Sequence, residues 1–179
     1  MKNVSEIDKR NYETIRQSVS QFQKNNLLEL RVPSRILDIA PEKHGGIMNM
    51  ASSMHTVETL DISEKYSPTY VMDICSTTPI ASETFDVIFC TEVIEHVNNP
   101  FLAIIEIHRL LKPGGIFLAT SPLNFRIHGP LPDNWRITEH GWRVLLKPFR
   151  DFRITEIEDP DRFLFPIHYQ VRAVKHLHQ

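Results

Sequence analysis

The first 30 residues combine many polar side chains with apolar side chains at helical spacing. The apolar positions recur at gaps of three to five residues: Ile7, Tyr12, Ile15, Val19, Phe22 and Leu27. Side chains at this spacing share one face of a helix, so the pattern predicts an amphipathic helix. A similar pattern predicts a second helix over about residues 100–111. The Pro113-Gly114-Gly115 sequence that follows predicts a turn.

After Pro33 the pattern changes to short apolar runs, which predict strands. Five buried strands are expected at residues 35–39, 56–61, 69–72, 85–90 and 116–120. Strands that are apolar throughout, and that helices or longer connections separate, form a parallel sheet. Two later runs, 152–157 and 169–174, alternate apolar and polar residues as antiparallel or edge strands do. The pattern therefore predicts an α/β fold: a Rossmann-like, seven-stranded, mostly parallel sheet with an antiparallel end strand and helices on both faces.

The connection between the second and third expected strands is short. Only eight residues, 62–69, link them, whereas a helical crossover needs about a dozen or more. We therefore expect a truncated second crossover, with a loop or a single helical turn in place of a helix. This leaves one face of the sheet thinly covered and suggests a partner surface, as in a homodimer.

The length and net charge of the chain limit the classes of protein to which it can belong. The chain has 179 residues and a net charge of −2, which suits a single domain, 1–179, made of an N-terminal helical cap (1–30) and a Rossmann-like core (31–179). The weak negative charge argues against nucleic acid as a partner, and no apolar run is long enough for a membrane span. The polar N-terminus does not resemble a signal peptide, and the two cysteines give neither a disulfide framework nor a zinc spacing. We expect a cytoplasmic protein.

An acidic residue ends one of the expected strands, and another directly follows the next strand. Ligands of open α/β sheets bind beyond the carboxyl ends of the strands. A carboxylate at Asp61 can accept both hydroxyl protons of a ribose there. Asp73 and Ile74 can bond an adenine amino group and cover its ring. The G-x-G-x-x-G pattern of NAD-binding proteins is absent after the first strand, which disfavours that cofactor.

Five segments, in order, resemble the motif series of the class I S-adenosylmethionine methyltransferases. They are RILDIAPEKHGG, VETLDIS, VMDICS, FDVIFCTEVIEHV and LLKPGGIFLATSP. The most similar variety is the small-molecule type found beside sugar and glycan biosynthesis genes. The resemblance implies an enzyme with S-adenosylmethionine as cofactor and a small-molecule acceptor, with a sugar or glycan hydroxyl favoured. It implies a set of cofactor-binding residues: Asp38, Ala40, Gly45, Asp61, Ile62, Asp73, Ile74, Cys90, Thr91 and Glu92.

The loop after the first strand departs from that family. The usual Gly-x-Gly-x-Gly positions read Ala40, Glu42 and His44, and glycines follow only at 45 and 46. Glu42 would repel the carboxylate of the cofactor if it pointed inward. The departure motivates an alternative, a degenerate methyltransferase fold that binds a cofactor or a partner without turnover. A nucleic acid methyltransferase is disfavoured, because an Asn/Asp-Pro-Pro-Tyr/Phe motif is missing after the fourth strand.

A long Pro-rich segment, 121–138, follows the fifth expected strand and resembles the HG-P-D-W-R-T stretch of glycan-linked methyltransferases. Methyl transfer to a hydroxyl is helped by a general base, and histidine suits that role near neutral pH. We predict His128 as the base, with His96 as the second choice. The expected substrate contacts are Asn124, Trp135 and Arg136.

Each of these assignments has a structural alternative. His128 can hydrogen-bond a carbonyl within its own loop. Glu92 and His96 are four positions apart, so they can pair on one helix face. Trp135 can belong to the core instead of stacking on a flat substrate. The nine histidines do not cluster at metal-binding spacing, so no metal site is expected.

Overall fold

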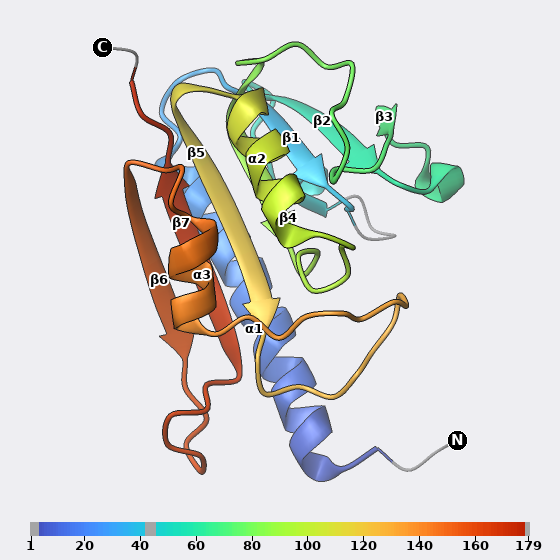
Figure 1. Ribbon diagram of the computed structural model, residues 1–179, viewed down its shortest axis with the longest axis vertical. Helices are drawn as coiled ribbons and strands as arrows, with labels where there is room; N and C mark the ends of the chain where they lie inside the picture. The colour runs from blue at the N-terminus through green and yellow to red at the C-terminus, as the bar shows by residue number, and fades with distance from the viewer. Residues whose placement is uncertain (1–3, 42–45, 178–179) are drawn as a thin grey trace.

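The computed structural model describes residues 4–41 and 46–177, and these form a sheet with helices on both faces (Figure 1). The strands are β1 (Arg35–Ile39), β2 (Thr56–Asp61), β3 (Tyr70–Val71), β4 (Phe85–Thr91), β5 (Leu111–Pro122), β6 (Asp151–Ile157) and β7 (His168–Val174). They lie in the order β3-β2-β1-β4-β5-β7-β6. The pairs among β1 to β5 are parallel, and β7 runs antiparallel to both β5 and β6. The expected fold class is confirmed.

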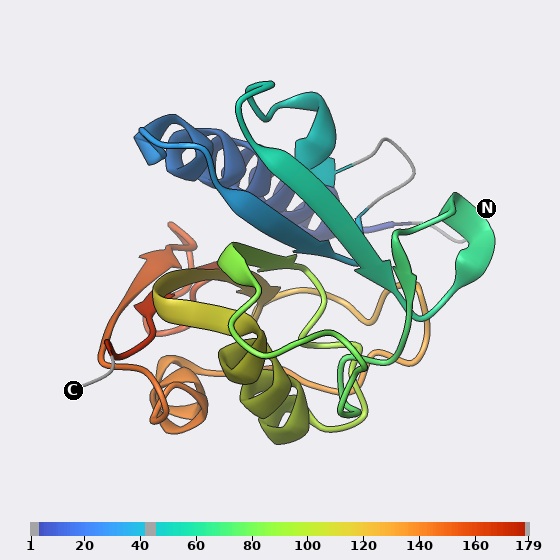
Figure 2. The same cartoon turned by 90° about the horizontal axis from the view of Figure 1, so that it is seen from above.

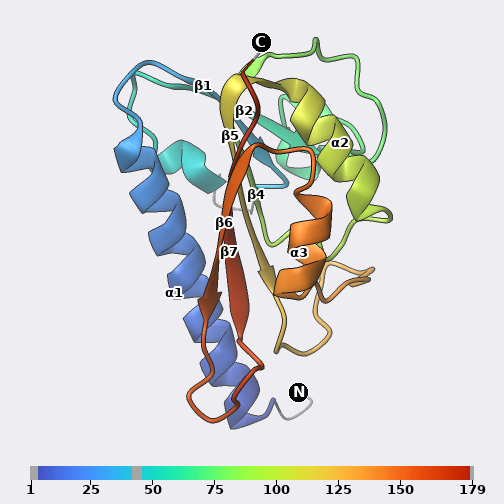
Figure 3. The same ribbon diagram turned by 60° about the vertical axis from the view of Figure 1, so that its left-hand side comes forward.

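The long N-terminal helix α1 (Glu6–Glu29) covers one face of the sheet (Figure 3). It begins after Ser5, whose hydroxyl accepts the backbone N–H of Asp8. Its apolar stripe brings Phe22 and Leu27 into a core with strand residues such as Phe89. The helical spacing of the first 30 residues therefore predicted the helix and most of its buried apolar residues, whereas Ile7 and Tyr12 are exposed.

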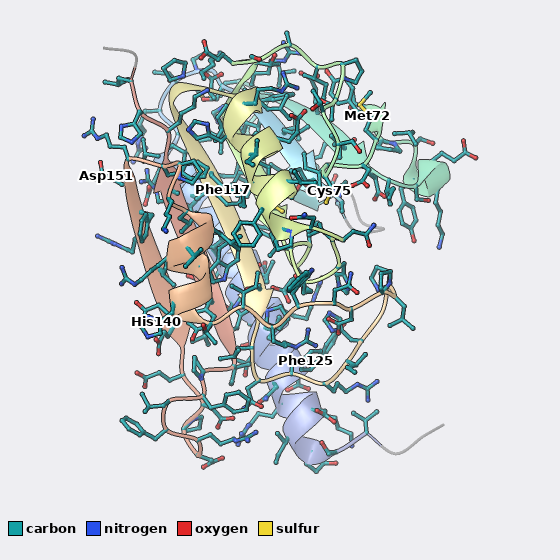
Figure 4. The ribbon with its side chains drawn as sticks, viewed as in Figure 1. Met72, Cys75, Phe117, Phe125, His140 and Asp151 are labelled. Carbon is teal, nitrogen blue, oxygen red and sulfur yellow. The ribbon has the colours of Figure 1, made fainter. Side chains whose placement is uncertain are left out.

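The opposite face carries α2 (Pro100–Leu110) and α3 (Glu139–Leu145). Asn99 caps α2 by accepting two backbone N–H groups. Trp142 of α3 is fully buried and donates its indole N–H to the hydroxyl of Ser121 at 3.0 Å. Figure 4 shows Phe117 of β5 beneath these helices, where it belongs to the larger core. The sheet is thus buried on both sides along β4 and β5.

Two features differ from the sequence prediction. β5 begins at Leu111, so the turn expected at Pro113–Gly115 is a bulge inside the strand. Gly114 adopts φ +76 there, and the pairing with β4 shifts register. Helix α3 was not predicted, because its seven residues include Gly141 and are too few to show a periodic pattern.

The second crossover has the truncated form that was expected. Between β2 and β3 the chain makes only the single turn η2 (Glu64–Tyr66). Seen from above in Figure 2, η2 and β3 extend beyond the helices of both layers. Across the described part of the chain, no helix combines the length and the apolar character that crossing a membrane requires.

Candidate functional site

The carboxyl ends of the parallel strands meet at one edge of the sheet. The register places Ile39 beside Leu60, Asp61 beside Val71, and Thr91 beside Thr120. The expected cofactor residues follow these strand ends, so the fold brings the described ones to one edge. Gly45 is the exception, because residues 42–45 lie outside the described residues.

Asp38 lies inside the molecule at the end of β1. Its Oδ2 accepts the backbone N–H of Ile47 at 3.0 Å. A Cβ on Gly46 would lie 2.1 Å from that oxygen, and Gly46 has φ +51, so the position requires glycine. Burial raises the pKa of Asp38 to about 7, although the hydrogen bond from Ile47 opposes the shift. Asp38 therefore positions the start of the turn η1 (Gly46–Asn49).

The end of β2 offers groups that suit a nucleoside. Asp61 Oδ1 accepts the N–H of Ser63 at 2.8 Å, which leaves Oδ2 for a ligand hydroxyl. Ile62 follows directly, and this apolar side chain is 69% exposed. A carboxylate acceptor beside an exposed apolar side chain fits a ribose with its flat base. These residues thus fit the adenosine part of S-adenosylmethionine.

The end of β3 fits the same ligand in part. Asp73 Oδ1 accepts the N–H of Cys75 at 2.8 Å and keeps its second oxygen for an amino group. Ile74 is buried in the core, so its side chain does not face a ligand and the expectation that it covers an adenine ring is wrong.

The chain turns sharply after β1 and after β4. Ala40 (φ 51) and Glu92 (φ 57) both adopt the left-handed conformation, which costs a side chain about 1 kcal/mol or more. Cys90 is fully buried, and the hydroxyl of Thr91 accepts the amide N–H of Gln23 at 2.9 Å. Because the Cys90 side chain is buried and the Thr91 hydroxyl is hydrogen-bonded, these two residues present mainly their backbone groups to a ligand at this edge.

Glu92 contacts β5 and β7. Its Oε1 accepts the hydroxyl of Thr120 at 3.0 Å and lies 2.7 Å from Nε2 of the fully buried His168. The alternative that Glu92 pairs with His96 on a helix face is wrong. Residues 92–97 form a turn, and α2 begins only at Pro100.

His96 and His128 meet beside that turn. Their rings pack edge to face with centroids 5.0 Å apart. Glu95 Oε1 lies 3.8 Å from Nε2 of His96 and 3.9 Å from Nε2 of His128. Burial raises the pKa of Glu95 well above its usual value, and the charge of Glu92 adds to this. The fold thus assembles two histidines from distant parts of the sequence around one buried carboxyl group.

Asp133 and Arg136 hold the loop that carries His128. Arg136 donates to both carboxylate oxygens of Asp133 and to the backbone carbonyls of Phe125 and Arg126. The backbone N–H of His128 donates to Asp133 Oδ2 at 3.0 Å, and its Nδ1 lies 3.1 Å from the same oxygen. Although burial opposes ionisation, the bonds from Arg136 and His128 hold the pKa of Asp133 at about 2. Asp133 is therefore a carboxylate, and Arg136 is occupied within the loop.

The other two expected substrate residues differ in their exposure. Asn124 is buried, donates to Asp159 at 3.0 Å and accepts from Arg162 at 2.9 Å. Trp135 donates its indole N–H to the carbonyl of Val97 at 2.8 Å and is 39% exposed. Of the three, Trp135 offers the most accessible surface to an acceptor.

Two cavities of the described structure lie away from this edge. One, of about 360 Å³, lies between α1 and the strands β6 and β7 and includes Arg153 and Arg172. The other, of about 290 Å³, lies near the amino ends of the strands and includes Arg35 and Thr84.

Known structures share this architecture. A structure described as a SAM-dependent methyltransferase from Archaeoglobus fulgidus superposes with a TM-score of 0.72 at 16% identity, over 89% of this chain and 94% of that one. A family model described as a methyltransferase domain matches residues 44–119. Residues 44–119 of this chain are thus similar to a methyltransferase domain, and the described structure shares the fold of such enzymes. This similarity agrees with the expected cofactor class, S-adenosylmethionine.

Two further relatives of the methyltransferase domain add detail. The 1,6-didemethyltoxoflavin-N1-methyltransferase of Burkholderia thailandensis, solved with S-adenosylhomocysteine, has a TM-score of 0.66 at 17% identity and covers 94% of this chain and 83% of its own. The ubiquinone biosynthesis O-methyltransferase of Pseudomonas syringae pv. tomato is 36% identical over 70 residues, or 38% of this chain. The chain spans 28% of the length of that curated relative.

Sequence reasoning missed three of the groups that shape the site. Glu95, Asp133 and His168 are not among the predicted site residues, and His168 lies just before the predicted strand 169–174. A signal for Glu95 was present, because it stands with Glu92 and His96 directly after β4, where ligands bind. His168 gives no such signal, since its contact with Glu92 depends on the sheet.

Proposed function

We propose that this protein transfers the methyl group of S-adenosylmethionine to a hydroxyl oxygen of a small molecule. The observation that carries the proposal is the setting of His128. Its Nδ1 lies 3.1 Å from the Asp133 carboxylate without hydrogen-bond geometry. The negative charge of that carboxylate still favours a proton on Nδ1, which leaves a lone pair on Nε2. The side chain is 22% exposed, so an acceptor can approach the ring.

The bound cofactor supplies an electrophilic methyl carbon. The protein positions the cofactor and the acceptor and supplies a proton acceptor. Asp61 binds the ribose hydroxyls, and the backbone of Cys90 and Thr91 lines the methionine side. Trp135 packs against the acceptor, and His128 Nε2 takes the hydroxyl proton as the oxygen attacks. The imidazolium then releases that proton to water.

An oxygen acceptor agrees with the names of the curated relatives, which are O-methyltransferases. Within that class, the resemblance to glycan-linked enzymes favours a sugar hydroxyl. The name of the Pseudomonas relative favours an intermediate of ubiquinone biosynthesis instead. The two choices differ in chemistry, so a panel of sugar nucleotides and phenols separates them.

The test is the transfer of isotope-labelled methyl from S-adenosylmethionine to that panel. We expect label in one acceptor class and an equal amount of S-adenosylhomocysteine. His128→Gln should lower turnover by about 10²-fold or more with unchanged cofactor affinity, and the exposed His140→Gln should have no effect. Cofactor binding without label transfer to any acceptor would favour the degenerate fold.

A single domain, a cytoplasmic location and a homodimer stay predictions. The homodimer would use the thinly covered region around η2, where Tyr66 is exposed. Light scattering of the purified chain measures the mass directly, and a monomer would contradict that prediction.

A further inference from the structure

Three side chains of types that bind metal ions in proteins lie close together beside the turn that follows β4. The ligand atoms of Glu95, His96 and His128 all lie within 4.8 Å of one another. Nitrogen and oxygen ligands about 2.0–2.1 Å from a tetrahedral zinc ion stand roughly 3.3 Å apart. Glu95 Oε1 is 3.8 Å and 3.9 Å from the two histidine Nε2 atoms. Small side-chain movements would therefore bring the three ligand atoms to the separation that a bound ion requires.

Both imidazoles present a lone pair toward Glu95. His96 Nδ1 lies 2.9 Å from the carbonyl of Pro132, which can only accept, so Nδ1 carries the proton and Nε2 does not. His128 Nδ1 lies 3.1 Å from the Asp133 carboxylate without hydrogen-bond geometry, and the negative charge of the carboxylate favours the same tautomer. Metal-binding histidines in proteins are fixed in this way, by a carbonyl or carboxylate on the outer ring nitrogen.

Glu95 itself lacks a partner for its carboxyl group. Its side chain is 1% exposed, and neither oxygen has a hydrogen bond within the described structure. A buried carboxyl group without a donor is unfavourable, and here it faces two lone pairs. A cation between the three side chains would satisfy all of them at once.

Backbone contacts hold the three ligands in place. The backbone N–H groups of Asn134 and Trp135 donate to the carbonyl of Glu95 at 2.7 Å and 3.0 Å. They tie the loop that carries His128 to the turn that carries Glu95 and His96. The two imidazoles are 14% and 22% exposed, so the set is open to solvent on one side.

We propose that Glu95, His96 and His128 bind a divalent transition-metal ion of the zinc type. Two imidazoles and one carboxylate suit such ions better than magnesium or calcium. The expectation of no metal site rested on sequence spacing, and the fold brings together histidines that the sequence separates.

Three protein ligands leave a coordination position for an oxygen on the exposed side. If the proposed function holds, that oxygen is the acceptor hydroxyl. A bound ion would lower the pKa of that hydroxyl, and the proton would leave to water. His128 is a ligand in that state and a base only in the ion-free protein. Ion binding itself does not depend on methyl transfer.

The test is a titration of the metal-depleted full chain with Zn²⁺ in competition with a chromophoric chelator. We expect one bound ion per chain. Glu95→Gln, which keeps the size of the side chain, and His128→Gln should each weaken the affinity by about tenfold or more. Two variants serve as controls and should leave the zinc affinity unchanged. His140→Gln lies on α3, away from the loop that carries Phe125 and His128 (Figure 4), and His176→Gln lies near the C-terminus.

Two outcomes would overturn the proposal: no bound ion in the wild-type chain, or unchanged affinity in both ligand variants. Circular dichroism of each variant separates a lost ligand from a lost fold, and His96→Gln replaces a variant that does not fold. Zinc binding without methyl transfer would contradict the proposed function alone. Methyl transfer by a chain that binds no zinc would contradict this inference alone.

Discussion

His168 of β7 and Glu92 at the end of β4 lie 2.7 Å apart, from Nε2 to Oε1. His168 is fully buried, and Glu92 is held in a left-handed conformation. The contact connects the antiparallel end of the sheet to the edge where the candidate site lies. It therefore supports the turn that carries Glu95 and His96.

Replacing His168 by alanine should destabilise the protein. The substitution leaves Glu92 without its imidazole partner and opens a space beneath the edge, at a cost of about 2–3 kcal/mol. Urea unfolding measures the change. The exposed His140→Ala serves as the matched control, and a loss no larger for His168→Ala than for the control would contradict the structural role.

Asp38 should make stability depend on pH. Its folded pKa is about 7, against an ordinary value of 3.8, so between these values the folded chain keeps a proton that the unfolded chain releases. The free energy of unfolding should therefore fall as pH rises from about 4 to 7, by roughly 1.4 kcal/mol per unit and about 4 kcal/mol in all. Asp38→Asn keeps an acceptor for Ile47 and should lose this contribution. Parallel profiles for both proteins would contradict the assignment.

Gly46 should tolerate no side chain. Gly46→Ala places a Cβ 2.1 Å from Asp38 Oδ2 at φ +51, and we expect a loss of about 2 kcal/mol or more. Gly129→Ala is the control, because a Cβ there meets nothing within 4 Å. Thermal unfolding of the two variants gives the comparison, and equal melting temperatures would show that the region around Gly46 adapts.

Asp61 should contribute to cofactor affinity. Asp61→Asn keeps the shape of the side chain and removes the charged acceptor for the ribose, so affinity for S-adenosylmethionine should fall by about 1–3 kcal/mol. Glu64→Gln, an exposed charge change in the adjacent turn η2, should leave it unchanged. Equal affinity in Asp61→Asn and the wild type would remove the ribose assignment.

The sequence predicted the first two strands of the parallel part best. Residues 35–39 and 56–61 agree with β1 and β2, because short runs rich in apolar and β-branched side chains are typical of strands in an α/β chain. The start of β5 was missed, since Pro113 and Gly114 predict a turn and only the pairing with β4 shows a bulge. Helix α3 is too short for its period to be visible.

The sequence predicted where the expected cofactor residues lie, at the ends of the strands, and their binding roles stay predictions. Asp61 is the last residue of β2, so its place at the edge can be derived from the order of elements. Arg136 was expected to meet substrate, yet it binds Asp133 three positions away. The neighbours of His128 come from another segment of the chain, and a single sequence does not place two such loops against each other.

The most direct test of the central claim is calorimetric titration of the purified chain with S-adenosylmethionine, S-adenosylhomocysteine and NAD. The account predicts micromolar binding of the first two, no binding of NAD, and weaker binding of the first two by Asp61→Asn. A folded chain that binds neither sulfur cofactor would contradict the claim that this domain is a working methyltransferase.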